Sequence, residues 1–350
     1  MKRVSRRESF KLAAIGTAGC LLGGLGELAR ASEPEEFAYV HPELRPFAKQ
    51  LMAMLEPMPE LSEKSLSFTR KAMGGWAQPP LQAPAWTRQS VPGLTGHPAV
   101  TVYVVNSDAS KRRPAILHTH GGGFVSGTAI SMVADLQRLA LELDCTIVTV
   151  DYRLAPETRY QGSIADNYAA LEWLYDNATS LGVDAGRIAV MGESAGGGHA
   201  ALLALKARDV GKVPIVAQVL IYPMLDDRTG TVETPKAPIG TIVWTAAKNR
   251  FGWGAFLGME PGMDAAPVAA VPARRSDLAG LPPTFIGVGA IDLFVDEDIM
   301  YAKRLIAAGV PTRLEVVPGA FHGFDGIAAS TQVAKNFHAS KVAALRSAFA

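Results

Sequence analysis

Residues 187–206, RIAVMGESAGGGHAALLALK, place a short apolar run, a glycine-containing turn and a longer segment in direct succession. The run 187–191 contains the β-branched and apolar residues that are typical of a buried strand. The segment 195–206 has the length of a helix that crosses between two strands. This stretch therefore predicts a strand that passes through a tight turn into a helix.

The same succession recurs along the chain. Short runs that predict strands lie at 100–105, 114–118, 145–150, 187–191, 215–222, 284–288 and 313–317. Longer segments that predict helices lie at 133–143, 164–177, 195–206, 296–308 and 331–349. Alternation of strands and helices is typical of a mostly parallel sheet with helices on both faces. We therefore expect the α/β fold class.

The remaining regions suggest how the chain is divided. Residues 1–31 combine a basic start, an uncharged apolar run and the small-x-small sequence Ala29-Arg30-Ala31, which predicts a cleaved signal peptide. Residues 32–92 show helical spacing of apolar residues and predict a helical cap region. Residues 93–350 form the predicted main domain. It is interrupted at about 224–277 by a segment without a clear strand, which predicts an insertion over the sheet edge.

The signal peptide contains Ser5-Arg6-Arg7-Glu8-Ser9-Phe10-Lys11, which resembles a bacterial twin-arginine signal. Its apolar run is shorter than the ~20 residues that a membrane-spanning helix needs, so we expect no stable membrane insertion. The predicted location is periplasmic or secreted. Lipidation at Cys20 is the weaker alternative, because Thr17 stands where a lipoprotein signal has an aliphatic residue.

Composition excludes several classes of protein. Of the 350 residues, 48% are hydrophobic and 19% are charged, so the chain can bury a large core and is not disordered. A net charge of +1 gives no reason to expect nucleic acid as a partner. Two cysteines, Cys20 and Cys145, cannot form a disulfide scaffold. No Cys/His cluster has zinc-like spacing, so no metal site is predicted.

Ser194 is the candidate nucleophile. It lies at the centre of Gly192-Glu193-Ser194-Ala195-Gly196, between a predicted strand and a predicted helix. In that context G-x-S-x-G is a nucleophile elbow, in which a tight turn presents the serine hydroxyl and small neighbours avoid a clash. The dipole of the following helix favours negative charge that develops beside the serine.

A glycine-rich loop is the candidate oxyanion hole. His120-Gly121-Gly122-Gly123 follows the predicted strand 114–118, and glycines allow free backbone N–H groups to approach a substrate oxygen. We predict that the N–H groups of Gly121 and Gly122, with that of Ala195, stabilise such an oxygen.

A serine nucleophile also needs a base and an orienting carboxylate, in the chain order Ser, Asp/Glu, His. His322 is the predicted base, because it follows the last predicted strand whereas His338 lies inside the terminal helix. Asp292 is the predicted carboxylate, because it lies in the loop after strand 284–288. Asp296 is the alternative, although it is better explained as the N-cap or first turn of the next helix.

Five ordered motifs together resemble the hormone-sensitive-lipase-like family of α/β-hydrolases: HGGGF at 120–124, DYRLAPE at 151–157, GESAGG at 192–197, Asp292, and FHGF at 321–324. The resemblance implies an eight-stranded sheet with a cap made from the N-terminal helices and the insertion. It implies a triad of Ser194, Asp292 and His322, and oxyanion donors at Gly121, Gly122 and Ala195. It also implies that no cofactor is needed and that residues 152–157 brace the active site.

Two positions depart from the family pattern. Glu193 stands where members more often carry aspartate, which keeps the charge but lengthens its reach. Leu293 stands where many members have proline after the catalytic aspartate, which leaves that loop less restricted.

The function implied by the resemblance is hydrolysis of small-molecule carboxylic esters with short to medium acyl chains. A lactone, a carbamate or a peptide is an alternative substrate. A non-catalytic ligand-binding or interaction protein on the same scaffold is a further alternative, against which His322 argues. No oligomeric state is predicted.

Overall fold

The computed structural model describes residues 37–76, 78–232 and 234–350. The predicted signal peptide at 1–31, with its twin arginines and Cys20, lies outside these residues. Among the helices of the described residues, none has the length and apolar character needed to cross a membrane.

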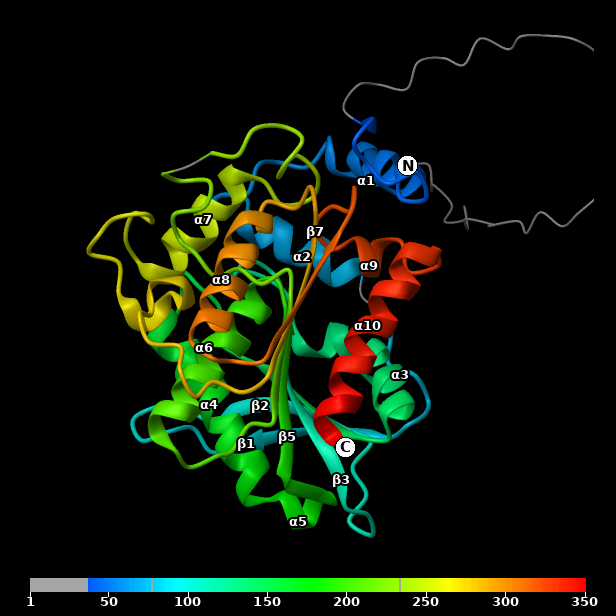
Figure 1. Cartoon of the computed structure of the whole chain (residues 1–350), viewed down its shortest axis with the longest axis vertical. Coiled ribbons are helices and arrows are strands. Elements are labelled where there is room, and N and C mark those ends of the chain that lie inside the picture. Colours follow the sequence, from blue (N-terminus) through cyan, green and yellow to red (C-terminus); the bar gives the residue numbers. More distant parts are fainter. Residues whose placement is uncertain (1–36, 77, 233) are drawn as a thin grey trace, which may run out of the picture. The chain divides into compact units, whose positions relative to one another are not determined.

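An eight-stranded sheet lies at the centre of the described residues (Figure 1). Its spatial order is β1-β2-β4-β3-β5-β6-β7-β8. The strands are β1 (Trp86–Val91), β2 (Val100–Val105), β3 (Arg113–Thr119), β4 (Thr146–Asp151), β5 (Val183–Glu193), β6 (Ala217–Ile221), β7 (Thr284–Gly289) and β8 (Thr312–Val317). β2 pairs antiparallel with β1 and β4, and the other pairs are parallel. The predicted α/β class with a mostly parallel sheet is confirmed.

The helices cover both faces of this sheet. They are α1 (Arg45–Leu55), α2 (Leu66–Trp76), α3 (Val133–Leu143), α4 (Tyr160–Asp176), α5 (Ala178–Leu181), α6 (Ala195–Val210), α7 (Ala246–Leu257), α8 (Val295–Ala307), α9 (Phe324–Ile327) and α10 (Gln332–Phe349). Further 3-10 turns lie at Ala129–Met132, Val268–Ala270 and Pro272–Arg274. Helices α4, α6 and α8 lie on one side of the sheet, and α3 and α10 on the other (Figure 1).

Strand β1 was not among the predicted strands, and it lies within the region 32–92 that was predicted as a helical cap. The helices of this region end at Trp76, and Trp86–Val91 pairs with β2 at the sheet edge. Most of the side chains of β1 are exposed or half-buried, and its sequence WTRQSV contains no apolar run. An edge strand with one partner needs little apolar surface, so hydrophobic patterning did not reveal it.

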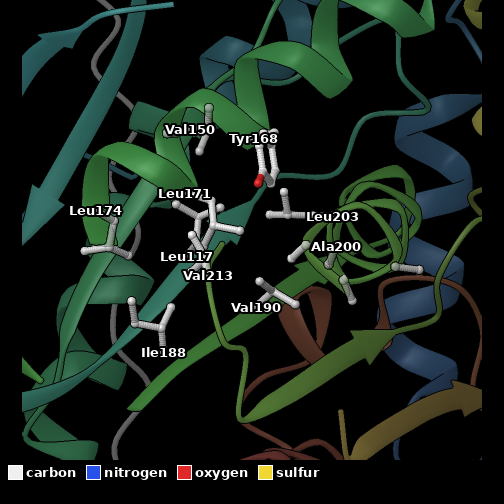
Figure 2. Packing of buried hydrophobic residues seen from close by; sticks show 14 of the residues in the cluster. Leu117, Val150, Tyr168, Leu171, Leu174, Ile188, Val190, Ala200, Leu203 and Val213 are labelled. Atoms are coloured by element: carbon white, nitrogen blue, oxygen red, sulfur yellow. The ribbon is translucent and has the colours of Figure 1, made fainter. Parts of the chain in front are cut away.

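The core follows the alternation of side chains along each strand. Leu117, Val148 and Val190 belong to the cluster that also contains α4 and α6, whereas Ile116 and Ile147 belong to the cluster with α3 and α10. Figure 2 shows Leu171 and Leu174 of α4, with Ala200 and Leu203 of α6, gathered over Leu117, Ile188 and Val190 of the strands.

The segment 224–277 contains α7 and two 3-10 turns and has no strand among its described residues. Trp253 and Phe256 of α7 pack with Phe124, Ala195 and Phe294, which follow the ends of three different strands. The insertion therefore covers the edge of the sheet at which the loops after β3, β5 and β7 meet.

The packing of α4 on the sheet predicts the effect of Leu171→Ala. Leu171 is 0% exposed in the core, so its truncation should lower the free energy of unfolding by about 2–5 kcal/mol. Leu141→Ala is the matched control, because Leu141 of α3 is 59% exposed and its loss should change stability by about 0.5 kcal/mol or less. Urea denaturation followed by circular dichroism measures both. Equal losses of unfolding free energy in the two variants would contradict the assignment of Leu171 to the core.

Candidate active site

Ser194 lies on the tight turn between β5 and α6, as predicted. Its backbone has φ of +58°, a region that L-residues rarely adopt. A Cβ on Gly192 would lie 2.3 Å from the carbonyl oxygen of Gly196, and a Cβ on Gly196 would lie 2.0 Å from that of Thr119. Only glycine fits at both flanking positions, which explains the sequence of the turn.

Ser194, His322 and Asp292 form one chain of hydrogen bonds. Ser194 Oγ lies 2.9 Å from His322 Nε2, and His322 Nδ1 lies 2.8 Å from Asp292 Oδ2. A carboxylate only accepts, so Nδ1 carries the proton and Nε2 accepts from the serine hydroxyl. Ser194 is 7% exposed, His322 6% and Asp292 1%.

Three separate loops bring these side chains together. Ser194 follows β5, Asp292 follows β7 and His322 follows β8, so all three come after the carboxyl ends of parallel strands. Carboxyl ends of parallel strands lie at the same edge of an open sheet.

Asp296 lies apart from this chain of bonds. It is exposed in the first turn of α8, whose N-cap residue is Phe294. Asp296 thus lies in the first turn of α8, which is one of the two helical positions predicted for it. It is not the N-cap residue, which was the other. Asp292 Oδ1 instead accepts the N–H of Phe294 at 3.0 Å, which fixes the carboxylate against the helix start.

The glycine loop passes against the serine turn. A Cβ on Gly121 would lie 3.0 Å from the carbonyl oxygen of Glu193 and 3.4 Å from Ser194 Cβ. Within the described part of the chain, the N–H groups of Gly121 and Gly122 donate to no backbone acceptor. The N–H of Ala195 opens α6, where a helix provides no acceptor of its own. The three predicted donors thus lack a backbone acceptor in this part of the chain, and Gly121 lies against the serine turn.

The segment 151–157 holds the glycine loop at both ends. The Tyr152 hydroxyl donates to the His120 carbonyl at 2.6 Å, and the Tyr152 ring stacks on the His120 ring with centroids 4.3 Å apart. The Ala155 N–H donates to the Phe124 carbonyl at 3.0 Å. Burial lowers the pKa of His120 to about 4, so its ring is neutral near pH 7. These contacts fit a bracing role for the segment.

Glu193 reaches back to the neighbouring strand. Its Oε2 lies 2.8 Å from His118 Nε2, and His118 Nδ1 lies 2.8 Å from Thr149 Oγ1. Burial acts to raise the pKa of the Glu193 carboxyl, but the charge and hydrogen bond of His118 outweigh it and the pKa is lowered. The longer side chain noted in the sequence therefore ties the serine turn to β3 and β4.

The loop that carries Asp292 is restrained without proline. Leu293 is buried, and a Cβ on Gly240 would lie 2.6 Å from Leu293 Cδ1. The N–H of Gly240 donates to the carbonyl of Ile291 at 3.0 Å. The insertion thus supplies a restraint on this loop that the amino-acid sequence alone did not reveal.

Aromatic rings surround the imidazole of His322. Ring centroids of Tyr222, Phe294 and Trp244 lie 4.7, 5.3 and 6.4 Å from it. Trp244 also touches the glycine loop, because a Cβ on Gly123 would lie 2.1 Å from its ring. Its indole N–H donates to Asn249 Oδ1 at 3.0 Å. Sequence reasoning missed Tyr222 and Trp244, whose contacts depend on tertiary packing and leave no local motif.

Among the described residues, neither a metal site nor a reactive thiol accompanies Ser194, His322 and Asp292. No group of three or more His, Cys, Asp or Glu side chains there is arranged to hold a metal ion. Burial raises the pKa of Cys145 to about 12, so this thiol stays protonated.

Comparisons with known proteins agree with the fold and the motifs. A family model described as alpha/beta hydrolase fold matches residues 116–326. Esterase LipI of Mycobacterium tuberculosis is 40% identical over 61% of this chain and 67% of its own length. Carboxylesterase NlhH of the same species is 38% identical over 67% of this chain and 74% of its own. A solved structure titled Bacterial Heroin Esterase is 36% identical, with a TM-score of 0.81 over 90% of this chain and 99% of that one. This chain belongs to the α/β hydrolase fold family.

Proposed function

We propose that this enzyme hydrolyses carboxylic esters of small molecules through an acyl-enzyme on Ser194. The observation that carries the proposal is the buried chain of hydrogen bonds from Ser194 through His322 to Asp292, beside the glycine loop. Esterase LipI, carboxylesterase NlhH and the heroin esterase structure support ester hydrolysis as the reaction class.

The steps of the reaction are divided among the three side chains and the backbone donors. His322 Nε2 takes the hydroxyl proton as Ser194 Oγ attacks the acyl carbon, and Asp292 stabilises the imidazolium that forms. The N–H groups of Gly121, Gly122 and Ala195 donate to the developing oxyanion. The imidazolium then protonates the leaving alcohol, and water repeats the sequence on the acyl-enzyme.

The acyl group is proposed to be short to medium in length. Trp244 supports this, because its ring lies against Gly123 of the glycine loop and 6.4 Å from the His322 ring, where it would narrow the space for a long acyl chain. A series of 4-nitrophenyl esters from acetate to palmitate tests chain length, with kcat/KM expected to fall steeply for the longest acids.

Ser194→Ala should lower kcat/KM for 4-nitrophenyl butyrate by at least about 10³-fold and abolish labelling by a fluorophosphonate, because the nucleophile is lost. Its thermal unfolding should stay close to that of the parent. Ser180→Ala, at an exposed serine, is the control and should retain full activity. Retention of more than a hundredth of the activity in Ser194→Ala would remove this residue as nucleophile. Absence of fluorophosphonate labelling in the parent would favour a non-catalytic binding protein.

Asp292 and Asp296 should respond differently to replacement by asparagine. Asp292→Asn should lower kcat by about 10⁴-fold, because an amide at this position favours the wrong imidazole tautomer. Asp296→Asn should change kcat by no more than about twofold, because its side chain is exposed in the first turn of α8. Steady-state kinetics with purified proteins measures both. A large defect in Asp296→Asn alone would assign the carboxylate to that residue.

We also propose that residues 1–31 direct export by the twin-arginine route to the periplasm or the medium, on the motif at 5–11. Replacing Arg6 and Arg7 together with lysine should leave the precursor in the cytoplasm, because the receptor reads the guanidinium pair and not charge alone. Immunoblots of cell fractions measure this, with a Lys2→Arg variant as control. Undiminished export of the double variant would indicate the general secretory route.

A further inference from the structure

A pocket lies against the segment that carries Trp244, outside the residues of the candidate active site. Its volume is about 540 Å³, which is within the range of small-ligand sites.

 Its lining comes from two places far apart in the sequence: Phe37 with α1 residues Lys49, Met52, Ala53 and Leu55 and the neighbouring Glu56, and the insertion residues Thr241, Val243, Thr245 and Lys248.

The wall of this pocket is shared with the candidate active site. Thr241, Val243 and Thr245 line the pocket, whereas the ring of Trp244 lies against the glycine loop and near His322. Val243 has φ of +69°, which is rare for a β-branched residue and is a strain typical of functional segments. A ligand in the pocket would therefore contact the segment that positions Trp244.

Lys248 gives the pocket an incompletely compensated positive charge. Its ammonium is half-buried and donates to the Val243 carbonyl at 2.6 Å. Burial lowers the pKa of this ammonium, and among the described residues no carboxylate acts against that effect. Partly buried charges in proteins are normally paired. An anion in the pocket would complete the set of partners of Lys248.

The rest of the lining defines the body of the ligand. Phe37, Met52, Leu55 and Val243 provide apolar surface, and Lys49 brings a second ammonium, 5.7 Å from the centroid of the Phe37 ring. Among the described residues of the lining, Glu56 is the one acid, and it would repel an anion placed beside it. The favoured orientation puts the anionic group near Lys248 and the apolar body over Phe37 and Met52.

We infer that this pocket binds an aliphatic carboxylate, with Lys248 as the partner of its carboxylate group and α1 as the support of its chain. Ester hydrolysis releases acids of this class, so the link between the pocket and a reaction product rests on the proposed function. Binding of a carboxylate is inferred from the pocket and its charged side chains alone.

Calorimetric titration with octanoate tests the inference on the full chain after Ser194 has reacted with a fluorophosphonate, which blocks the active site. We expect one binding event. Lys248→Met should weaken it at least tenfold, Lys248→Arg should restore most of it, and Lys335→Met, at an exposed lysine of α10, should leave it unchanged. Octan-1-ol should bind at least tenfold more weakly than octanoate.

Three results would overturn the inference: no octanoate binding at millimolar concentration, equal affinity in Lys248→Met, or equal affinity for octanol. Thermal unfolding of each variant shows whether it is folded, and Lys49→Met gives a second test of the charge if Lys248→Met does not fold. Failure of the fluorophosphonate to label Ser194 would count against the proposed function alone. In that case the comparison of Lys248→Met with the parent still decides whether the pocket binds octanoate.

Discussion

The left-handed backbone of Ser194 is the constraint on which the rest of the site depends. With φ of +58° between β5 and α6, the residue needs neighbours without side chains, and Gly192 and Gly196 meet that need. The strain is held by the sheet on one side and α6 on the other, both buried in the core. Because the turn is fixed, the glycine loop after β3 can pass within van der Waals distance of it.

Burial makes the partners of Ser194 interdependent. His322 and Asp292 are both nearly inaccessible to solvent, and a buried charge is costly unless it is paired. The hydrogen bond between them meets this condition, and the rings of Tyr222 and Phe294 restrict the imidazole. On the other side of Ser194, the pair of Glu193 with His118 joins the turn to β3. The site is thus positioned by packing from several strands.

Much of the fold and the site could be predicted from the sequence because their signals are local. The succession of strand, glycine turn and helix around Ser194 is one such signal, and the position of His322 after the last strand is another. Strand β1 was missed because its sequence is polar and it lies at an edge. Trp244 and Lys248 were missed because Trp244 lies against the glycine loop and near His322, and Lys248 lines a pocket together with residues of α1. No spacing in the sequence reports such neighbours.

Catalysis through an acyl group on Ser194 is tested most directly by rapid mixing of the enzyme with 4-nitrophenyl acetate. We expect a burst of 4-nitrophenol equal to one equivalent of enzyme whenever deacylation is the slower step. After acid quenching, peptide mass spectrometry should find the acetyl group on Ser194. An acetyl group on another residue during turnover, with Ser194 unmodified, would contradict an acyl-enzyme on Ser194.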